Sequence, residues 1–207
     1  MGSTMNPAPL QFYFDFISPF GYFASLRIDE LAERHGRTVD WHPILLGVSV
    51  LKVMGLKPLL DTPLKGPYTA NDVRRYAREH GVRLEPDLGA VQMKPLTCGR
   101  AFAWARRHHP AAAKGLARAL QHAHWHDGVD LSEPQALAGI ALPAPFSGAD
   151  LASMVQQPEA AGLLRGEVQA ALDAGVFGSP TVIVDGEMFW GVDKLETLDR
   201  WLQRGGW

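Results

Sequence analysis

The chain has 207 residues, a formal net charge of −2 and 46% hydrophobic residues, which is an ordinary composition for a globular protein that folds without disulfides. Its basic residues are interspersed with acidic ones, so neither a nucleic acid nor an anionic membrane is expected as the main partner. The sole cysteine, Cys98, excludes an intrachain disulfide and a Cys-x-x-Cys redox pair, and with no secretory-type start or long apolar run we expect a cytoplasmic protein acting on small molecules.

The first predicted elements form a strand, helix and strand unit. Apolar residues at positions 10, 12, 14 and 16 predict a strand, and apolar residues at helical spacing then predict one helix from Pro19 that ends at Gly36. A second strand is expected over residues 38–44. Such a unit is parallel and right-handed, which places Ser18 at the carboxyl edge of the sheet, where ligands usually bind.

No strand pattern occurs between Gly47 and Gly175, so this region is predicted to be a large helical insertion. Prolines punctuate its loops. Helices are expected near 70–80, 96–109, 111–127, 133–141, 147–155 and 158–174.

The end of the chain returns to the sheet. A strand at 182–184, the turn Asp185-Gly186 and a strand at 188–190 predict a hairpin, which a last helix follows. Pro180 stands at the mouth of this hairpin and is expected to follow a cis peptide bond. Together the elements predict an α/β protein with a thioredoxin-like fold: residues 1–9 as an extension, 10–46 and 176–207 as the thioredoxin-like domain, and 47–175 as the insertion.

Ser18 is the first candidate functional residue. The first turn of a helix has unpaired N–H groups and the positive end of the helix dipole, so a thiolate or carboxylate beside Ser18 is stabilised there. The local alternative is that Ser18 only caps the helix, since serine is a preferred N-cap residue.

Four segments of the chain, read together, resemble a known family. They are Phe14-Asp15-Phe16-Ile17-Ser18-Pro19-Phe20, Lys65-Gly66-Pro67-Tyr68 with Asp72, Val176-Phe177-Gly178-Ser179-Pro180-Thr181, and Phe189-Trp190-Gly191-Val192-Asp193-Lys194. The chain thereby resembles the thioredoxin-like family of 2-hydroxychromene-2-carboxylate isomerases and kappa-class glutathione transferases, which is related to the periplasmic disulfide oxidoreductases.

This resemblance implies glutathione as the cofactor and Ser18 as the catalytic residue, whose hydroxyl donates to the glutathione sulfur. It further implies that the backbone of Ser179 pairs with the cysteinyl part, Asp193 with the γ-glutamyl ammonium and Lys65 with the glycyl carboxylate. Val192, Lys194 and Leu56 depart from common family residues, so Val192 is expected to contribute through its backbone. The implied glutathione-binding residues are Ser18, Pro19, Phe20, Lys65, Ser179, Pro180, Val192 and Asp193.

The implied reaction is the isomerisation of a small aromatic carboxylate of the 2-hydroxychromene-2-carboxylate kind, in a protein expected to be a homodimer. The candidates for an apolar wall of the substrate site are Tyr76, Phe20, Trp104 and Phe177. The candidates for binding the substrate carboxylate are Lys57, Arg74 and Arg100. The alternatives are a kappa-like glutathione transferase or peroxidase and a non-catalytic thioredoxin-like binding module; the single cysteine argues against a dithiol oxidoreductase.

Several candidate residues also have a structural interpretation. Asp193 with Glu196 matches a capping box for the last helix, and Lys65 in a Pro/Gly loop matches a solvated lysine. Cys98 is expected to be a buried apolar residue without a catalytic role. His122, His124 and His126 lack a third fixed ligand, so no metal site is expected.

Overall fold

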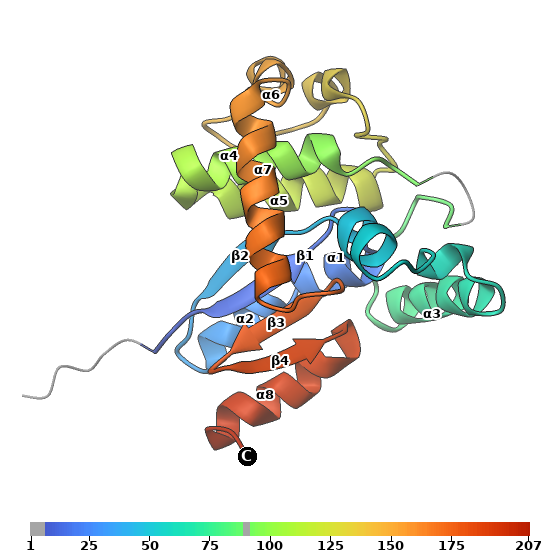
Figure 1. Ribbon diagram of the computed structural model, residues 1–207, viewed down its shortest axis with the longest axis vertical. Helices are drawn as coiled ribbons and strands as arrows, with labels where there is room; N and C mark the ends of the chain where they lie inside the picture. The colour runs from blue at the N-terminus through green and yellow to red at the C-terminus, as the bar shows by residue number, and fades with distance from the viewer. Residues whose placement is uncertain (1–6, 89–91) are drawn as a thin grey trace, which may run out of the picture.

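The computed structural model describes residues 7–88 and 92–207 (Figure 1). Most of the predicted extension, residues 1–6, lies outside the described residues.

The sheet has the predicted topology. Its strands β1 (Leu10–Phe14), β2 (Val39–Pro43), β3 (Thr181–Val184) and β4 (Glu187–Trp190) lie in the order β2-β1-β3-β4. β1 is parallel to β2 and antiparallel to β3, and β3 and β4 form an antiparallel hairpin. Asp185 and Gly186 in the hairpin turn both have positive φ, 51° and 83°, as a tight two-residue turn requires.

Strand β1 is covered on both faces. Phe12 and Phe14 pack against Trp41 of β2, and Phe14 also contacts Phe102 of the insertion. Tyr13 faces the other way, into a smaller cluster with residues at the end of α7 (Pro158–Asp173). Figure 1 shows α7 in front of the sheet. The carboxyl end of β1 is therefore held rigidly.

The single helix predicted from Pro19 to Gly36 is wrong, because the structure has two helices there, α1 (Pro19–Ser25) and α2 (Ile28–Arg34). The Ser25 hydroxyl donates a 2.7 Å hydrogen bond to the Tyr22 carbonyl, and Arg27 N–H bonds to the Ala24 carbonyl instead of continuing the α-helical pattern. A serine that bonds back to the preceding turn disturbs a helix in this way.

The described residues between 47 and 175 form helices joined by loops and contain no strand, as predicted. The structure corrects three details. A π-helical turn η1 (Gly47–Val53) was not expected; α3 begins at Lys65, so that lysine is not in a loop; and the segment near 133–141 is a 3-10 helix, η3. The other elements are η2 (Leu59–Asp61), α3 (Lys65–Glu79), α4 (Leu96–His108), α5 (Pro110–Trp125), η3 (Pro134–Gly139), α6 (Gly148–Met154), η4 (Val192–Lys194) and α8 (Leu195–Arg204).

One hydrophobic core joins the insertion to the sheet. Phe14 and Phe16 contact Phe102 of α4, with ring centroids 5.4 and 6.2 Å apart, and the Trp125 indole of α5 donates to the Phe16 carbonyl at 3.0 Å. The predicted division into domains stays a prediction, since this core continues from one part into the other. Among the described residues, no helix is both long and apolar enough to cross a membrane.

Candidate active site at the amino end of helix α1

Ser18 lies directly between β1 and α1 and is the N-cap residue of α1. Its Oγ accepts a 3.0 Å hydrogen bond from Gly21 N–H, so the structural role considered for it is confirmed. The same hydroxyl donates to the Ser179 carbonyl at 3.1 Å. The Ser18 hydroxyl thus accepts from the first turn of α1 and directs its own hydrogen toward the loop before β3.

That loop carries the predicted cis peptide, Ser179–Pro180, which the structure confirms. The Ser179 hydroxyl accepts a 3.0 Å hydrogen bond from Asp15 N–H. A Cβ at Gly21 would lie 2.6 Å from Ser179 Oγ, so glycine is needed for this close approach. Residues 161 positions apart in the chain thus form one compact polar junction.

Asp15 was not singled out by the sequence as a functional residue, yet it organises this junction. Its buried carboxylate accepts hydrogen bonds from Leu46 N–H at 2.7 Å and from Ile17 N–H at 3.2 Å. Burial raises the pKa of Asp15 to about 7, against the opposing effect of these backbone hydrogen bonds. The only sequence signal was an acidic residue inside an apolar strand end, Phe14-Asp15-Phe16.

The segment Val192–Asp193 packs next to α1 through the 3-10 turn η4. Val192 is buried in the core, which leaves only its backbone for a ligand. The capping-box prediction for Asp193 is wrong: α8 begins at Leu195 without a side-chain cap, and the exposed Asp193 carboxylate lies 2.6 Å from Lys194 Nζ. Gly191 (φ 110°) allows this, because a Cβ there would meet Asp193 Oδ1 at 2.4 Å.

The remaining predicted glutathione ligands are Pro19, Phe20 and Lys65. Pro19 is the first residue of α1, and Phe20 is half-buried with its ring 6.2 Å from that of Phe23. Lys65 is the exposed first residue of α3. Within the part of the chain that the structure describes, no hydrogen bond or ion pair joins Lys65 to Ser18, Ser179 or Asp193.

An aromatic pair lies beside the cis-proline loop. The rings of Phe177 and Trp190 meet edge to face at 4.8 Å, and a Cβ at Gly178 would collide with the Trp190 indole. Trp190 is about half exposed and was not among the predicted wall residues. The only feature of the sequence that could have indicated Trp190 was its position at the end of the last strand, before Gly191.

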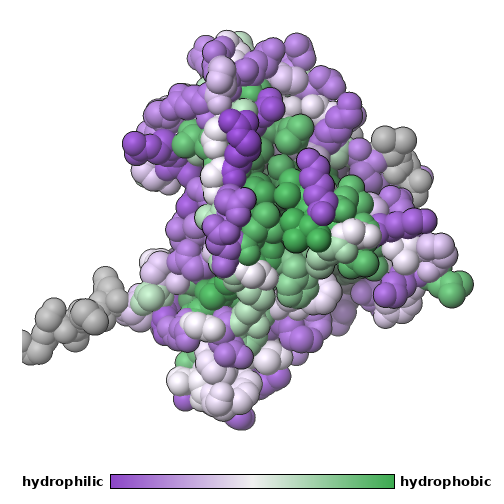
Figure 2. Space-filling view, in the orientation of Figure 1, coloured by the Kyte–Doolittle hydropathy of each residue, from purple (hydrophilic) through white to green (hydrophobic). Residues whose placement is uncertain are grey.

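Apolar side chains gather at the centre of the face on which η1 and α7 lie, as Figure 2 shows. Half-buried Leu45, Val48, Leu163 and Leu172 pack against a buried cluster formed by Ala103 of α4 with Leu164 and Val168 of α7. Leu45 of this cluster precedes Leu46, whose N–H donates to Asp15.

Among the described residues, the other two predicted wall residues make no ring contact with Phe177 or Trp190. Tyr76 stacks between Phe23 and His80, and its hydroxyl accepts a 2.9 Å hydrogen bond from Arg27. Trp104 contacts His108 and His109, where α4 ends and α5 begins.

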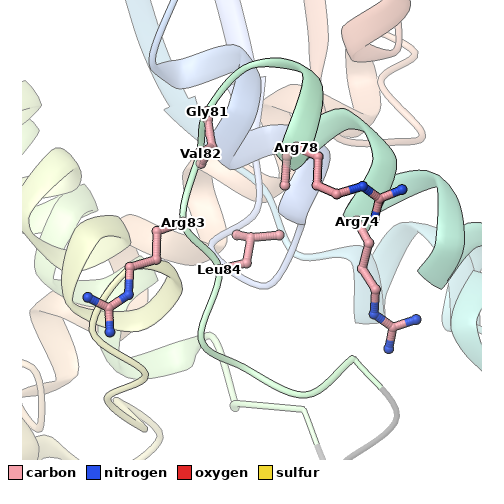
Figure 3. Close-up of a pocket in the computed structure, with 7 residues that line it drawn as sticks. Arg74, Arg78, Gly81, Val82, Arg83 and Leu84 are labelled. Carbon is pink, nitrogen blue, oxygen red and sulfur yellow. The ribbon is translucent and has the colours of Figure 1, made fainter.

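The three cations considered for the substrate carboxylate are also dispersed. Arg100 donates to the Val155 carbonyl at 3.3 Å, and Lys57 is exposed in the stretch before η2. Arg74 lines a hollow of about 440 Å³ with Arg78, Arg83 and apolar residues. Figure 3 shows Arg74 and Arg83 on opposite sides of Leu84, with their guanidinium groups pointing apart, so they do not converge on one anion.

Cys98 is fully buried in α4, as expected. Burial, followed by the nearby charges of Asp15 and Asp130, raises the pKa of its thiol far above the usual range, which keeps it protonated.

Comparison with known proteins gives a consistent result across nearly the full length. Residues 9–203 match the family model of the DSBA-like thioredoxin domain. A 2-hydroxychromene-2-carboxylate isomerase of Sphingobium xenophagum is 30% identical over 203 residues, covering 93% of this chain and 97% of the relative. The same enzyme of Pseudomonas putida is 28% identical, with 92% of each chain covered.

Solved structures agree on the fold. A structure named 2-hydroxychromene-2-carboxylate isomerase has a TM-score of 0.80 at 25% identity and covers 94% of each chain. A probable DsbA oxidoreductase of Streptomyces coelicolor, at 14% identity and a TM-score of 0.73, shares the fold.

Proposed function

Because this chain belongs to the DSBA-like thioredoxin-domain family and, within it, to the 2-hydroxychromene-2-carboxylate isomerases, we propose that it is a glutathione-dependent isomerase of such aromatic carboxylates with Ser18 as its catalytic residue. The names of the relatives support isomerase activity. The observation that carries the assignment of Ser18 is its hydroxyl, held at the amino end of α1 with its oxygen bonded by Gly21 N–H and its hydrogen directed toward the cis-proline loop.

The residues present fit the two ends of glutathione. Asp193 offers an exposed carboxylate for an ammonium group, and Lys65 offers an exposed cation for a carboxylate. The Ser179 carbonyl, beside a cis proline, offers an acceptor for an added extended segment. The pairing of Asp193 with Lys194 would have to open, which costs little at an exposed ion pair.

The hydrogen bond from Ser18 to Ser179 suggests how the hydroxyl becomes available. A backbone N–H of a bound peptide that donates to the Ser179 carbonyl would take the place of the Ser18 hydrogen. Gly21 N–H keeps the Ser18 oxygen in position, so its hydrogen can turn toward a sulfur anion at the helix terminus without moving the chain.

Glutathione, when bound, would supply a thiolate that adds reversibly to the conjugated double bond of the substrate, allowing rotation about that bond before the thiolate leaves. The protein's part is to hold the sulfur ionised and to exclude water from the reacting atoms. Ser18 and the α1 dipole serve the first task. Phe177 and Trp190 offer an aromatic wall for the second, in the position that the cis-proline loop gives them.

Asp15 supports the site by adding less negative charge than an ordinary carboxylate would. A carboxyl whose pKa is raised to about 7 is substantially protonated at neutral pH. A fully ionised carboxylate three residues from Ser18 would oppose a sulfur anion at the helix terminus.

The proposal is tested by incubating the protein with 2-hydroxychromene-2-carboxylate, with and without glutathione, while the ultraviolet spectrum and the free thiol concentration are followed. We expect the spectrum to approach an equilibrium mixture only in the presence of glutathione, with no thiol consumed. Stoichiometric loss of thiol would instead indicate a transferase. If calorimetry detects no glutathione binding at millimolar concentration, both enzymatic functions are excluded and a binding module remains.

A further inference from the structure

A second group of chemically reactive side chains lies at the carboxyl end of α5. His122 and His126 share one face of the helix, and the structure places Asp127 between them. We propose that these three residues form a binding site for one divalent transition-metal ion of the zinc, nickel or copper type. This departs from the sequence-based expectation, in which the two imidazoles lacked a third fixed ligand.

The side chains already face one another. His122 Nδ1 lies 3.2 Å from Asp127 Oδ2, and His126 Nδ1 lies 2.8 Å from Asp127 Oδ1. One ligand atom from each of the three residues lies within 4.8 Å of the others. Donor atoms around a tetrahedral zinc ion with bonds of about 2.0–2.1 Å are roughly 3.4 Å apart, so small side-chain rotations suffice.

The backbone that carries these ligands is well held. His126 N–H and Asp127 N–H both bond to the His122 carbonyl, at 2.9 and 3.1 Å. Gly128 follows with φ 74°, and its N–H bonds to the His124 carbonyl at 3.1 Å. This helix end turns the chain back, so that the Asp127 carboxylate lies over the last turn of α5 rather than extending into solvent.

The donor set indicates the class of ion. Two imidazole nitrogens and one carboxylate oxygen suit zinc, nickel and copper, whereas magnesium and calcium prefer six or more oxygen ligands. All three residues are partly or largely exposed, so water can complete the coordination. His124 does not take part, since its ring faces the Val129 carbonyl on the buried side of the helix.

Without metal, the arrangement is a surface group in which the Asp127 carboxylate lies within hydrogen-bonding distance of both imidazoles. The hydrogen bond from His126, and then the charges and hydrogen bond of His122, lower the pKa of Asp127, which any cation in this place would do. An exposed pair of this kind contributes little stability. Metal uptake and its loss in variants therefore separate the two possibilities.

The experiment is a calorimetric titration of the chelator-treated, tag-free protein with zinc chloride, and with magnesium chloride as a comparison. We expect one zinc ion per chain and no magnesium binding. His126→Ala and Asp127→Asn should each weaken zinc binding by more than about tenfold, since even residues behind metal ligands contribute about 10- to 100-fold. Both variants should fold, because the side chains are exposed.

The matched control is His108→Ala. His108 is also an exposed histidine near a helix end, and it lies 2.9 Å from the Glu159 carboxylate, but among the residues that the structure describes it belongs to no group of three potential metal ligands. Its replacement should leave zinc binding unchanged. The proposal is overturned if the wild-type protein takes up no zinc, or if the His122→Ala/His126→Ala variant binds zinc as tightly as the wild type. Neither outcome bears on the isomerase proposal, because Ser18 does not enter the measurement.

Discussion

Two acids near opposite ends of the neighbouring strands β1 and β2, one buried and one partly exposed, have opposite electrostatic behaviour. Asp15, after β1, has backbone N–H donors and, among the described residues, no cationic partner, and burial raises its pKa to about 7. Asp40 in β2 is also affected by burial, but hydrogen bonds from His42 and Arg106 and the charge of Arg106 outweigh it and lower its pKa. The presence of a partner of opposite charge, rather than burial itself, decides whether the pKa of the acid is raised or lowered.

The surroundings of the two acids explain this difference. Asp40 belongs to a network that ties β2 to the insertion: Arg106 of α4 lies 2.6 Å from Asp40 and 3.1 Å from Glu167 of α7, and His42 contacts both acids at 3.1 Å. Asp15 lies next to the Ser18 junction. The acidic side chains are paired with cations where the insertion is attached to β2. Beside the Ser18 junction, where the proposed sulfur anion would bind, burial instead favours the uncharged form of Asp15.

The comparison is tested most strongly by the pH dependence of stability in Asp15→Asn and Asp40→Asn. The folded pKa of Asp15 is raised from 3.8 to about 7, so its contribution is fully present below pH 3.8 and is lost as the pH rises to about 7. The stability of the wild type relative to Asp15→Asn should fall across this window by several kcal/mol, since one pKa unit corresponds to about 1.4 kcal/mol.

Asp40 provides the control for this measurement. Its lowered pKa makes its contribution present above pH 3.8 and lost only as the pH falls below that value. The stability of the wild type relative to Asp40→Asn should therefore stay level from about pH 4.5 to 5.5, where Asp40 is ionised and the pH is still below the ordinary pKa of His42, which, against the effect of burial, the hydrogen bond to Asp40 raises further. Urea unfolding at several pH values measures both differences; a flat curve for Asp15→Asn would contradict the comparison.

Replacement of Ser18 tests the polar junction between Ser18 and Ser179. Ser18→Ala should lower kcat by about 100-fold or more, as the loss of one preorganised donor does, while loss of the cap reduces the free energy of unfolding by only about 1 kcal/mol. Steady-state kinetics and urea unfolding measure the two effects. Ser25→Ala, which removes a buried hydroxyl from the same helix, serves as the control and should keep its activity. Unchanged turnover in Ser18→Ala would refute its catalytic role.

Arg106 probes the charged network. Arg106→Met should reduce the free energy of unfolding by about 2–3 kcal/mol, less than the loss of a fully buried ionic partner, because the Arg106 side chain is 19% exposed. The exposed neighbour gives the control, Arg107→Met, which should change stability by less than about 0.5 kcal/mol. Equal effects of the two replacements would mean that the network does not attach the insertion.

The smallest effect is expected at the contact between α1 and the cis-proline loop. Gly21→Ala puts a Cβ 2.6 Å from Ser179 Oγ and should reduce stability by about 1–2 kcal/mol, with a loss of activity because Ser179 must shift. Removal of that oxygen in Gly21→Ala/Ser179→Ala should restore part of both. A double variant no better than the sum of the single ones would show that the two side chains do not interact.

The sequence alone determined the elements that local patterns encode. Alternating apolar residues gave β1, the pair Asp185-Gly186 gave the hairpin, and Ser18-Pro19 gave the start of α1. The cis bond before Pro180 was also predicted, because only X-Pro bonds adopt the cis form at low cost and a proline is tolerated at the entry of a strand. These features depend on interactions within a few residues, which is why the residue order is sufficient for them.

Only the tertiary structure brought distant residues together. The Ser18 hydroxyl meets Ser179 and the Asp15 carboxylate meets Leu46 across long stretches of chain, and Trp190 meets Phe177 at the base of the β3-β4 hairpin. It also moved Tyr76 and Trp104 into other contacts and buried Val192 in the core, although their residue types suited a binding site. Such contacts depend on how the insertion packs on the sheet, because packing decides which side chains share a surface and which acids gain a charged partner.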